Sequence, residues 1–137
     1  MQPGTHEEAL RWLAEAEEDI AVAQTLRDTQ HFSRACFHAQ QGAEKAMKAF
    51  LYAQGVDEPW GHSVAKLVEE ATTYDADLGG FGHAGSILDR HYIPTRYPNG
   101  LPGGLPSKAY FDEDAQAAIA SAGQIVDRIR VAVMQAG

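Results

Sequence analysis

Cysteine is almost absent from the sequence, with Cys36 the only one among 137 residues. One thiol cannot form a disulfide within the chain, so a disulfide-stapled scaffold is excluded and we expect a protein of the reducing cytoplasm. Long apolar runs are lacking too, since no stretch approaches the roughly 18 residues that span a bilayer. The opening MQPGTHEEALRW has neither the basic nor the apolar region of a signal peptide. These absences predict a chain without a membrane segment.

Positive charge is scarce, because eleven Lys and Arg stand against nineteen Asp and Glu, for a net charge of −8. An acidic chain does not bind nucleic acid over its whole surface, so an anion site requires a local basic patch. Only the stretches 32–54 and 89–110 are net positive, each with three bases and one acid. An anion site would need these two stretches to meet in space, and chance clustering of so few charges is the alternative.

Regular alternation of apolar and polar residues is absent, whereas apolar residues recur at helical spacing in several stretches. Hydrophobic residues make up 45% of the chain, which is enough for a core. The acids of the first such stretch, Asp19 among them, are expected on a solvated face. The sequence therefore predicts one all-α domain over residues 1–137, an up-and-down bundle of four to five helices. The expected helices are 5–27, 32–54 and three that begin near His62, Asp75 and Asp112.

Proline and glycine concentrate in residues 93–107, IPTRYPNGLPGGLPS. This stretch holds four of the six prolines and three glycines, so neither a helix nor a central strand is expected there. Loops of this length in so small a domain are usually functional or disordered. We therefore expect a long Pro/Gly-rich loop before the last helix, with Arg96 and Tyr97 within it.

The expected helix 32–54 has two unlike faces. At about 100° per residue, five polar side chains fall within a stripe about 80° wide that contains no acid. They are Arg34, His38, Gln41, Lys45 and Lys48. Lys and Arg engage phosphate while His and Gln add directed hydrogen bonds, so the stripe has the chemistry of an anion site. The plain alternative is a solvated helix face opposite a buried apolar one.

The six histidines do not predict a metal site. His38, His62, His83 and His91 fall on separate elements, and no pair has the spacing of a ligand motif such as His-Glu-x-x-His. Cys36 lies on the apolar face of its helix and is expected to be an inert buried thiol. Neither a metal nor a cofactor is therefore predicted.

The string FHAQQGAEKAMKA at residues 37–49 resembles the signature helix of the HEPN family (higher eukaryotes and prokaryotes nucleotide-binding domain). The surrounding stretches match in the same order. Residues 12–19 are similar to the family's opening helix, and 62–64 (His-Ser-Val) to its short motif before the third helix. The string YIPTRYP at 92–98 resembles its late Tyr-x-Pro-x-Arg-Tyr-Pro loop, and 112–125 the start of its last helix. The matches cover nearly the whole chain.

This resemblance implies the family's helical bundle, commonly a homodimer, that binds a nucleotide or RNA phosphate in a basic cleft. Such proteins often work beside a minimal nucleotidyltransferase in a toxin–antitoxin-like pair, so such a subunit is an expected partner. Arg34 joins the implied binding set by its place on the polar stripe, and Arg90 by its place before the late loop. The positions that match the family's binding motif are His38, Gln41, Lys45, Lys48, Arg96 and Tyr97.

RNase members of the family carry an Arg and a His separated by four to six residues, which stabilise charge and transfer protons at the scissile phosphate. This spacing is absent, because only three residues separate Arg34 from His38 and no His follows Arg96. We therefore expect binding rather than catalysis. Two alternatives stay open: a metal-independent RNase toxin that uses His38 or His91, and a non-catalytic module that docks an acidic protein partner.

Overall fold

The computed structural model describes residues 5–97, 100–101 and 103–136, and the regular elements within these ranges are helices. The predicted all-α bundle is thereby confirmed. The stretch expected as one helix from Asp75 is divided into a 3₁₀ helix and a short α-helix. The elements are α1 (Thr5–Asp28), α2 (Phe32–Ala53), α3 (Val64–Ala71), the 3₁₀ helix η1 (Ala76–Phe81), α4 (Gly82–Asp89), α5 (Pro106–Ala109) and α6 (Asp112–Ala136).

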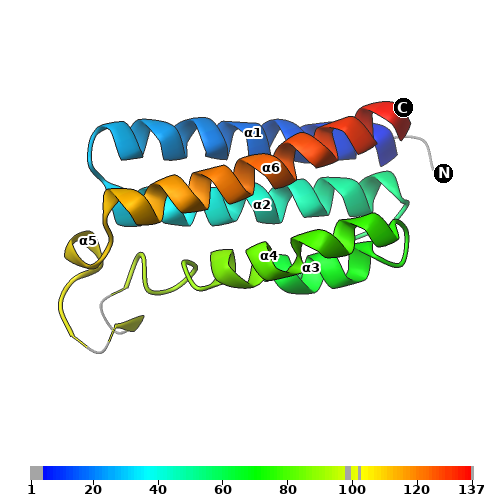
Figure 1. The fold of residues 1–137 in the computed structure, drawn as a ribbon. Helices are drawn as coiled ribbons and strands as arrows, with labels where there is room; N and C mark the ends of the chain where they lie inside the picture. Colours follow the sequence, from blue (N-terminus) through cyan, green and yellow to red (C-terminus); the bar gives the residue numbers. More distant parts are fainter. Residues whose placement is uncertain (1–4, 98–99, 102, 137) are drawn as a thin grey trace.

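Helix α2 is the central element of the bundle. Helices α1 and α6 lie along one side of it, while α3 and α4 cover the other (Figure 1). The approach of α1 is close because α2 has Gly42 at the contact. A Cβ atom there would lie 2.8 Å from the Ile20 Cδ1 atom and 3.2 Å from the Ala16 carbonyl oxygen. Gly42 thus allows α1 to pack closely against α2, which brings the polar side chains of α2 within reach of α1.

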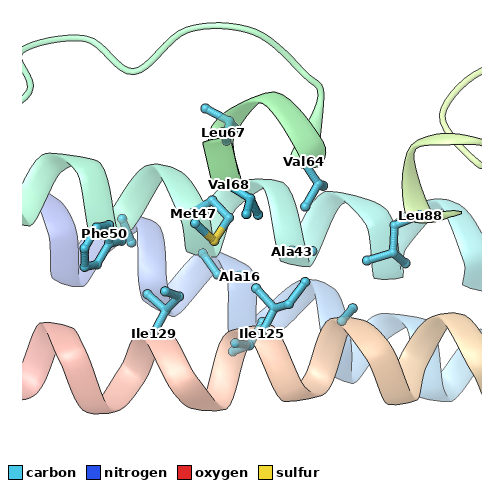
Figure 2. Close-up of a cluster of buried hydrophobic side chains, with 14 of the residues drawn as sticks. Ala16, Ala43, Met47, Phe50, Val64, Leu67, Val68, Leu88, Ile125 and Ile129 are labelled. Carbon is cyan, nitrogen blue, oxygen red and sulfur yellow. The ribbon is translucent and has the colours of Figure 1, made fainter. Parts of the chain in front are cut away.

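The core is assembled around the apolar face of α2. Met47 of this helix lies beside Val68 of α3, and the same buried cluster contains Leu88 of α4 and Ile125 and Ile129 of α6 (Figure 2). Most of the apolar face of α6 is buried, with Ile129 inaccessible to solvent and Ile119 only partly covered. None of the helices in the described ranges is long and apolar enough to cross a membrane.

The long stretch before α6 lies beside the amino-terminal end of α2 (Figure 1). The expectation that residues 93–107 contain no helix is wrong at their end, because Pro106 opens the single turn α5. Proline suits the first position of a helix, where the missing amide donor has no partner to lose. Pro98 and Pro102 lie outside the described residues.

Candidate functional site

The polar stripe of α2 is largely covered rather than fully solvated. Arg34 is exposed, but His38, Gln41 and Lys45 are half-buried and Lys48 is only 7% exposed. Two buried carboxylates, the loop before α3 and the stretch that follows α4 account for this covering. The stripe is therefore better described by its partners than as a single row of cations.

The first carboxylate is Asp19 of α1, which contacts two residues of the stripe. Its Oδ1 atom lies 2.9 Å from His38 Nδ1, and its Oδ2 atom lies 2.7 Å from Lys45 Nζ. Burial by itself would raise the pKa of Asp19, but hydrogen bonding to His38 and Lys45 outweighs it and places the pKa below its ordinary value. The expectation that Asp19 is solvated is wrong, since only 8% of the residue is exposed.

The second carboxylate is Glu44, which belongs to α2 itself and is 3% exposed. It accepts hydrogen bonds from Lys48 Nζ at 3.2 Å and Gln41 Nε2 at 3.2 Å. It also lies 3.3 Å from Nδ1 of His62, which approaches from the loop before α3. The Lys48 ammonium lies 5.6 Å from the ring centroid of Trp12. Lys48 is therefore held between a buried acid and an aromatic face.

The two carboxylates share one arrangement. Each contacts one lysine and one histidine, so the positive charges of Lys45 and Lys48 are balanced by Asp19 and Glu44. A phosphate that bound these lysines would have to compete with a carboxylate already in contact. Within the described ranges, Arg34 is consequently the cation of the stripe that has no carboxylate partner.

Arg34 is joined to the late loop, where Arg96 lies. Its Nη1 atom donates a hydrogen bond to the Thr95 carbonyl oxygen at 2.9 Å and a second one to Ser33 Oγ at 3.2 Å. The Thr95 hydroxyl in turn donates to the carbonyl oxygen of His91, and Thr95 is fully buried. The two net-positive stretches that the sequence distinguished therefore meet through Arg34 and the residue before Arg96.

Arg96 lies on a group of aromatic rings. Its guanidinium carbon is 4.2 Å from the ring centroid of Phe37, 4.7 Å from that of Tyr92 and 5.0 Å from that of Tyr97. Its Nε atom donates to the Tyr92 carbonyl oxygen at 3.0 Å. Within the described ranges, neither Arg34 nor Arg96 forms an ion pair with a carboxylate. Their positive charges remain available to an anion.

Arg90 points to a different part of the molecule. It lines a cavity of about 360 Å³ between α4 and α6, together with His91, Glu113 and Asp114. None of the residues lining this cavity belongs to the polar stripe of α2. Burial lowers the pKa of His91, which favours its neutral form there. The eight predicted binding residues thus fall into separate groups, centred on the late loop, on Asp19, on Glu44 and on this cavity.

The loop that carries His62 is fixed from two sides. Gln40, which is fully buried in α2, donates from Nε2 to the His62 carbonyl oxygen at 2.8 Å. Asp89 accepts from the Val64 amide at 2.7 Å and from Ser63 Oγ at 2.8 Å, and so holds the beginning of α3. Sequence reasoning missed these positioning residues. Two features of the sequence could have identified them: the polar residues Gln40 and Glu44 next to the apolar face of their helix, and the His62-Ser63 motif.

Comparison with known proteins gives one consistent result. A family model described as HEPN domain matches residues 9–132. The crystal structure of TT1696 from Thermus thermophilus is 34% identical, with 90% of this chain and 96% of that chain covered and a TM-score of 0.84. ST0689, described as an archaeal HEPN homologue, is 32% identical, with coverages of 92% and 98% and a TM-score of 0.76.

Two further relatives are more distant in sequence. An HEPN domain protein of Thermotoga maritima, TM0613, is 24% identical over 90% of this chain and 98% of that one, with a TM-score of 0.73, and so supports the fold alone. The Methanocaldococcus jannaschii protein named "Putative toxin MJ1304" is 25% identical over 141 residues, or 87% of this chain and 84% of that protein.

Proposed function

The chain belongs to the HEPN domain family, and on this premise we propose that it binds a phosphate group of a nucleotide or of RNA at Arg34 and Arg96. The observation that carries the proposal is that Arg34 bonds the carbonyl oxygen of Thr95, the residue before Arg96, and that neither arginine has a carboxylate partner in the described part of the chain. Guanidinium groups suit phosphate because their donors match its oxygens in pairs. Aromatic rings beneath Arg96 fix its position before a ligand arrives.

The other predicted residues take flanking roles in this proposal. His38 lies one helical turn after Arg34 on the same face, and Tyr97 is exposed beside Arg96. Lys45 and Lys48 contribute a weaker attraction, because each already contacts an acid. Gln41 helps to hold Glu44, while Arg90 acts only on a ligand that extends towards α6.

Binding measurements on single arginine variants test this proposal. Arg34→Ala and Arg96→Ala should each weaken binding of AMP or a short RNA about tenfold or more, since a charged hydrogen bond contributes roughly 1.5–3 kcal/mol. Binding should also weaken as salt rises, because phosphate contacts release counterions. Arg11→Ala is the matched control, an arginine on α1 whose side chain is 79% exposed and pairs with Glu8. Equal affinities for all four proteins would contradict the proposal.

We further propose that the chain works as the HEPN member of a toxin–antitoxin-like system in the cytoplasm. Its similarity to a protein named as a toxin supports this role. In this proposal the chain is a homodimer and its partner is a minimal nucleotidyltransferase. Co-expression with a nucleotidyltransferase encoded beside it should give a complex on affinity purification, and light scattering should give twice the chain mass for the free protein. A free protein with the mass of one chain, and no nucleotidyltransferase in the purified sample, would contradict the proposed dimer and the proposed partner.

A second candidate function, metal-independent RNA cleavage, is favoured by the contact between His38 and Asp19. The carboxylate orients the imidazole through Nδ1 and leaves Nε2 for proton transfer, with Arg34 four positions earlier to stabilise charge. His91 is less suited, because it lines the cavity against α6. RNA cleavage in EDTA that is lost in His38→Ala and kept in His91→Ala would support this function. His83→Ala, an exposed histidine of α4, is the control.

A further inference from the structure

A second cavity lies beside Tyr92, whose ring contacts Arg96. It measures about 240 Å³ and is lined by His62, Ser63, Asp89 and Tyr92. Tyr92 is the link to the proposed phosphate site, because the Arg96 guanidinium lies 4.7 Å from its ring centroid and Arg96 Nε donates to its carbonyl oxygen. A ligand with its phosphate at Arg96 therefore has this cavity as immediate neighbour.

The aromatic wall of the cavity is a pair of stacked rings. The ring centroids of His62 and Tyr92 are 5.1 Å apart, with an angle of 16° between the ring planes. The His62 side chain is 63% exposed, so part of its ring remains accessible although Tyr92 covers it on one side. Buried Glu44 contacts Nδ1 of the same ring at 3.3 Å, which sets the orientation of the imidazole, and Nε2 has no hydrogen-bond partner in the described part of the chain. The result is a flat, oriented ring with one nitrogen available for a hydrogen bond.

Asp89 and Ser63, the other two residues that line the cavity with polar side chains besides the rings, already have hydrogen-bond partners. Asp89 accepts from the Val64 amide at 2.7 Å, the Ala65 amide at 3.1 Å and Ser63 Oγ at 2.8 Å, and from Gln40 Nε2 at 3.3 Å. Ser63 Oγ in turn accepts from the Lys66 amide. The first amides of α3 are thus unavailable to an anion, and the charge of Asp89 repels one. The occupant that fits is a neutral planar ring.

We propose that the cavity of His62 and Tyr92 is a nucleobase site, which takes the base of the ligand whose phosphate binds Arg34 and Arg96. This inference rests on the proposed function and extends it from a phosphate to a whole nucleotide. Stacking supplies most of the attraction, because among the described residues Nε2 is the one His62 nitrogen left to form a hydrogen bond. The site therefore distinguishes bases weakly, and a purine with its larger ring system binds better than a pyrimidine.

Binding of AMP and of ribose 5-phosphate, which lacks the base, tests the site. Wild-type protein should bind AMP about tenfold more tightly than ribose 5-phosphate, as expected for one stacked base. His62→Gln removes the ring but keeps a hydrogen-bonding group towards Glu44, and it should abolish this difference. His62→Phe keeps a flat ring and should retain most of it. Tyr74→Ala, which removes a half-exposed tyrosine of the α3–η1 connection, should change neither affinity.

The outcomes separate the two proposals. Equal binding of AMP and ribose 5-phosphate by wild-type protein, both weakened by Arg96→Ala, would overturn the base site and leave the phosphate site standing. An AMP preference that survives in His62→Gln would also overturn it. If Arg96→Ala changes neither affinity, the proposed phosphate site is wrong. Binding of adenosine, which has no phosphate, then tests the base site by itself. Adenosine binding that His62→Gln abolishes supports the base site, and absence of adenosine binding to wild type overturns it. Thermal unfolding of each variant verifies that it is folded.

Discussion

Asp19 and His38 link α1 to the polar face of α2, with 2.9 Å between Asp19 Oδ1 and His38 Nδ1. Because the pKa of Asp19 is lowered, this carboxylate is ionised at neutral pH, and a hydrogen bond to it requires the proton of His38 on Nδ1. The neutral imidazole then presents Nε2 as an acceptor. The same carboxylate contacts Lys45 at 2.7 Å, so one acid of α1 positions two residues of the candidate site.

Replacement of Asp19 by alanine should lower the free energy of unfolding by about 3 kcal/mol at pH 7, since it leaves a half-buried ammonium without its partner. The lowered pKa means that this stabilisation is present above the unfolded-state pKa of about 3.9 and is lost as pH falls through the folded-state value. Urea unfolding at several pH values measures it. The control is Glu18→Ala, at an exposed neighbouring position. A difference between Asp19→Ala and wild type that stays constant down to pH 2 would contradict the assignment.

Gly42→Ala should destabilise the protein although alanine favours helix. The added Cβ would meet Ile20 Cδ1 at 2.8 Å and the Ala16 carbonyl oxygen at 3.2 Å. Overpacking costs about 1–3 kcal/mol and the gain in helix propensity offsets roughly 1 kcal/mol, so we expect a net loss of about 1 kcal/mol. Gly123→Ala is the matched control, because apart from the adjoining backbone of α6 no atom of the described residues lies within 4 Å of a Cβ there, and it should raise stability. The unfolding temperatures of the two variants measure this difference. Equal changes in unfolding temperature would contradict the prediction and show that α1 moves to accommodate the new methyl group.

The positions of the helices could be predicted because their signals are local. The expected helix 32–54 corresponds to α2 at Phe32–Ala53, where apolar spacing and Gly55, with a φ of 92°, mark the end. The partners of its polar face could not be predicted in the same way. Periodicity places Lys45 and Lys48 on one face, but it does not show which residues of other elements cover that face. Asp19 lies on a different helix, and its contact is a product of tertiary packing.

Arg90 shows the same limit over a shorter distance. Its position in the chain predicts a place beside the late loop, yet Arg90 lines the cavity against α6, while the preceding residue, Asp89, accepts a hydrogen bond at the beginning of α3. Successive residues at the end of a helix diverge by about 100°, so the last residues of α4 decide the direction of each side chain. An error of one residue in the predicted end of the helix therefore changes the side of the bundle to which a side chain is assigned. Proximity in sequence alone therefore gave the wrong direction for Arg90.

Cys36 should resist thiol reagents in the folded protein. Burial raises the pKa of its thiol to about 12, with a smaller contribution from Asp114, so very little thiolate exists at pH 8. Because this pKa lies above its unfolded value, the associated stability is present below about pH 9 and declines as pH rises towards 12. Reaction with an aromatic disulfide reagent should proceed only at the unfolding rate, whereas Ser86→Cys, at an exposed position, should add one fast-reacting thiol. A fast reaction of wild type would place Cys36 at the surface.

Lys48→Met should lower stability far more than it lowers phosphate affinity. Lys48 is 7% exposed and contacts Glu44, which is 3% exposed, so its removal leaves a buried carboxylate with Gln41 and His62 as its partners in the described part of the chain. Loss of one member of a buried pair costs about 3–5 kcal/mol. Glu44→Gln in the same chain removes the unpaired charge and should restore part of the loss.

The binding readout separates this structural role from a ligand role. If Lys48 acts through Glu44, the double variant Lys48→Met with Glu44→Gln should regain stability and bind ribose 5-phosphate, which has no base to contact His62, within about twofold of wild type. If Lys48 instead contacts the ligand directly, stability also recovers in the double variant, but the affinity stays about tenfold lower than that of wild type. Arg96→Ala serves as the reference, because Arg96 has no carboxylate partner in the described ranges and its loss should reduce affinity about tenfold without leaving a buried carboxylate unpaired. The ratio of the two effects thus distinguishes the cations that hold the bundle together from those that are free for a phosphate.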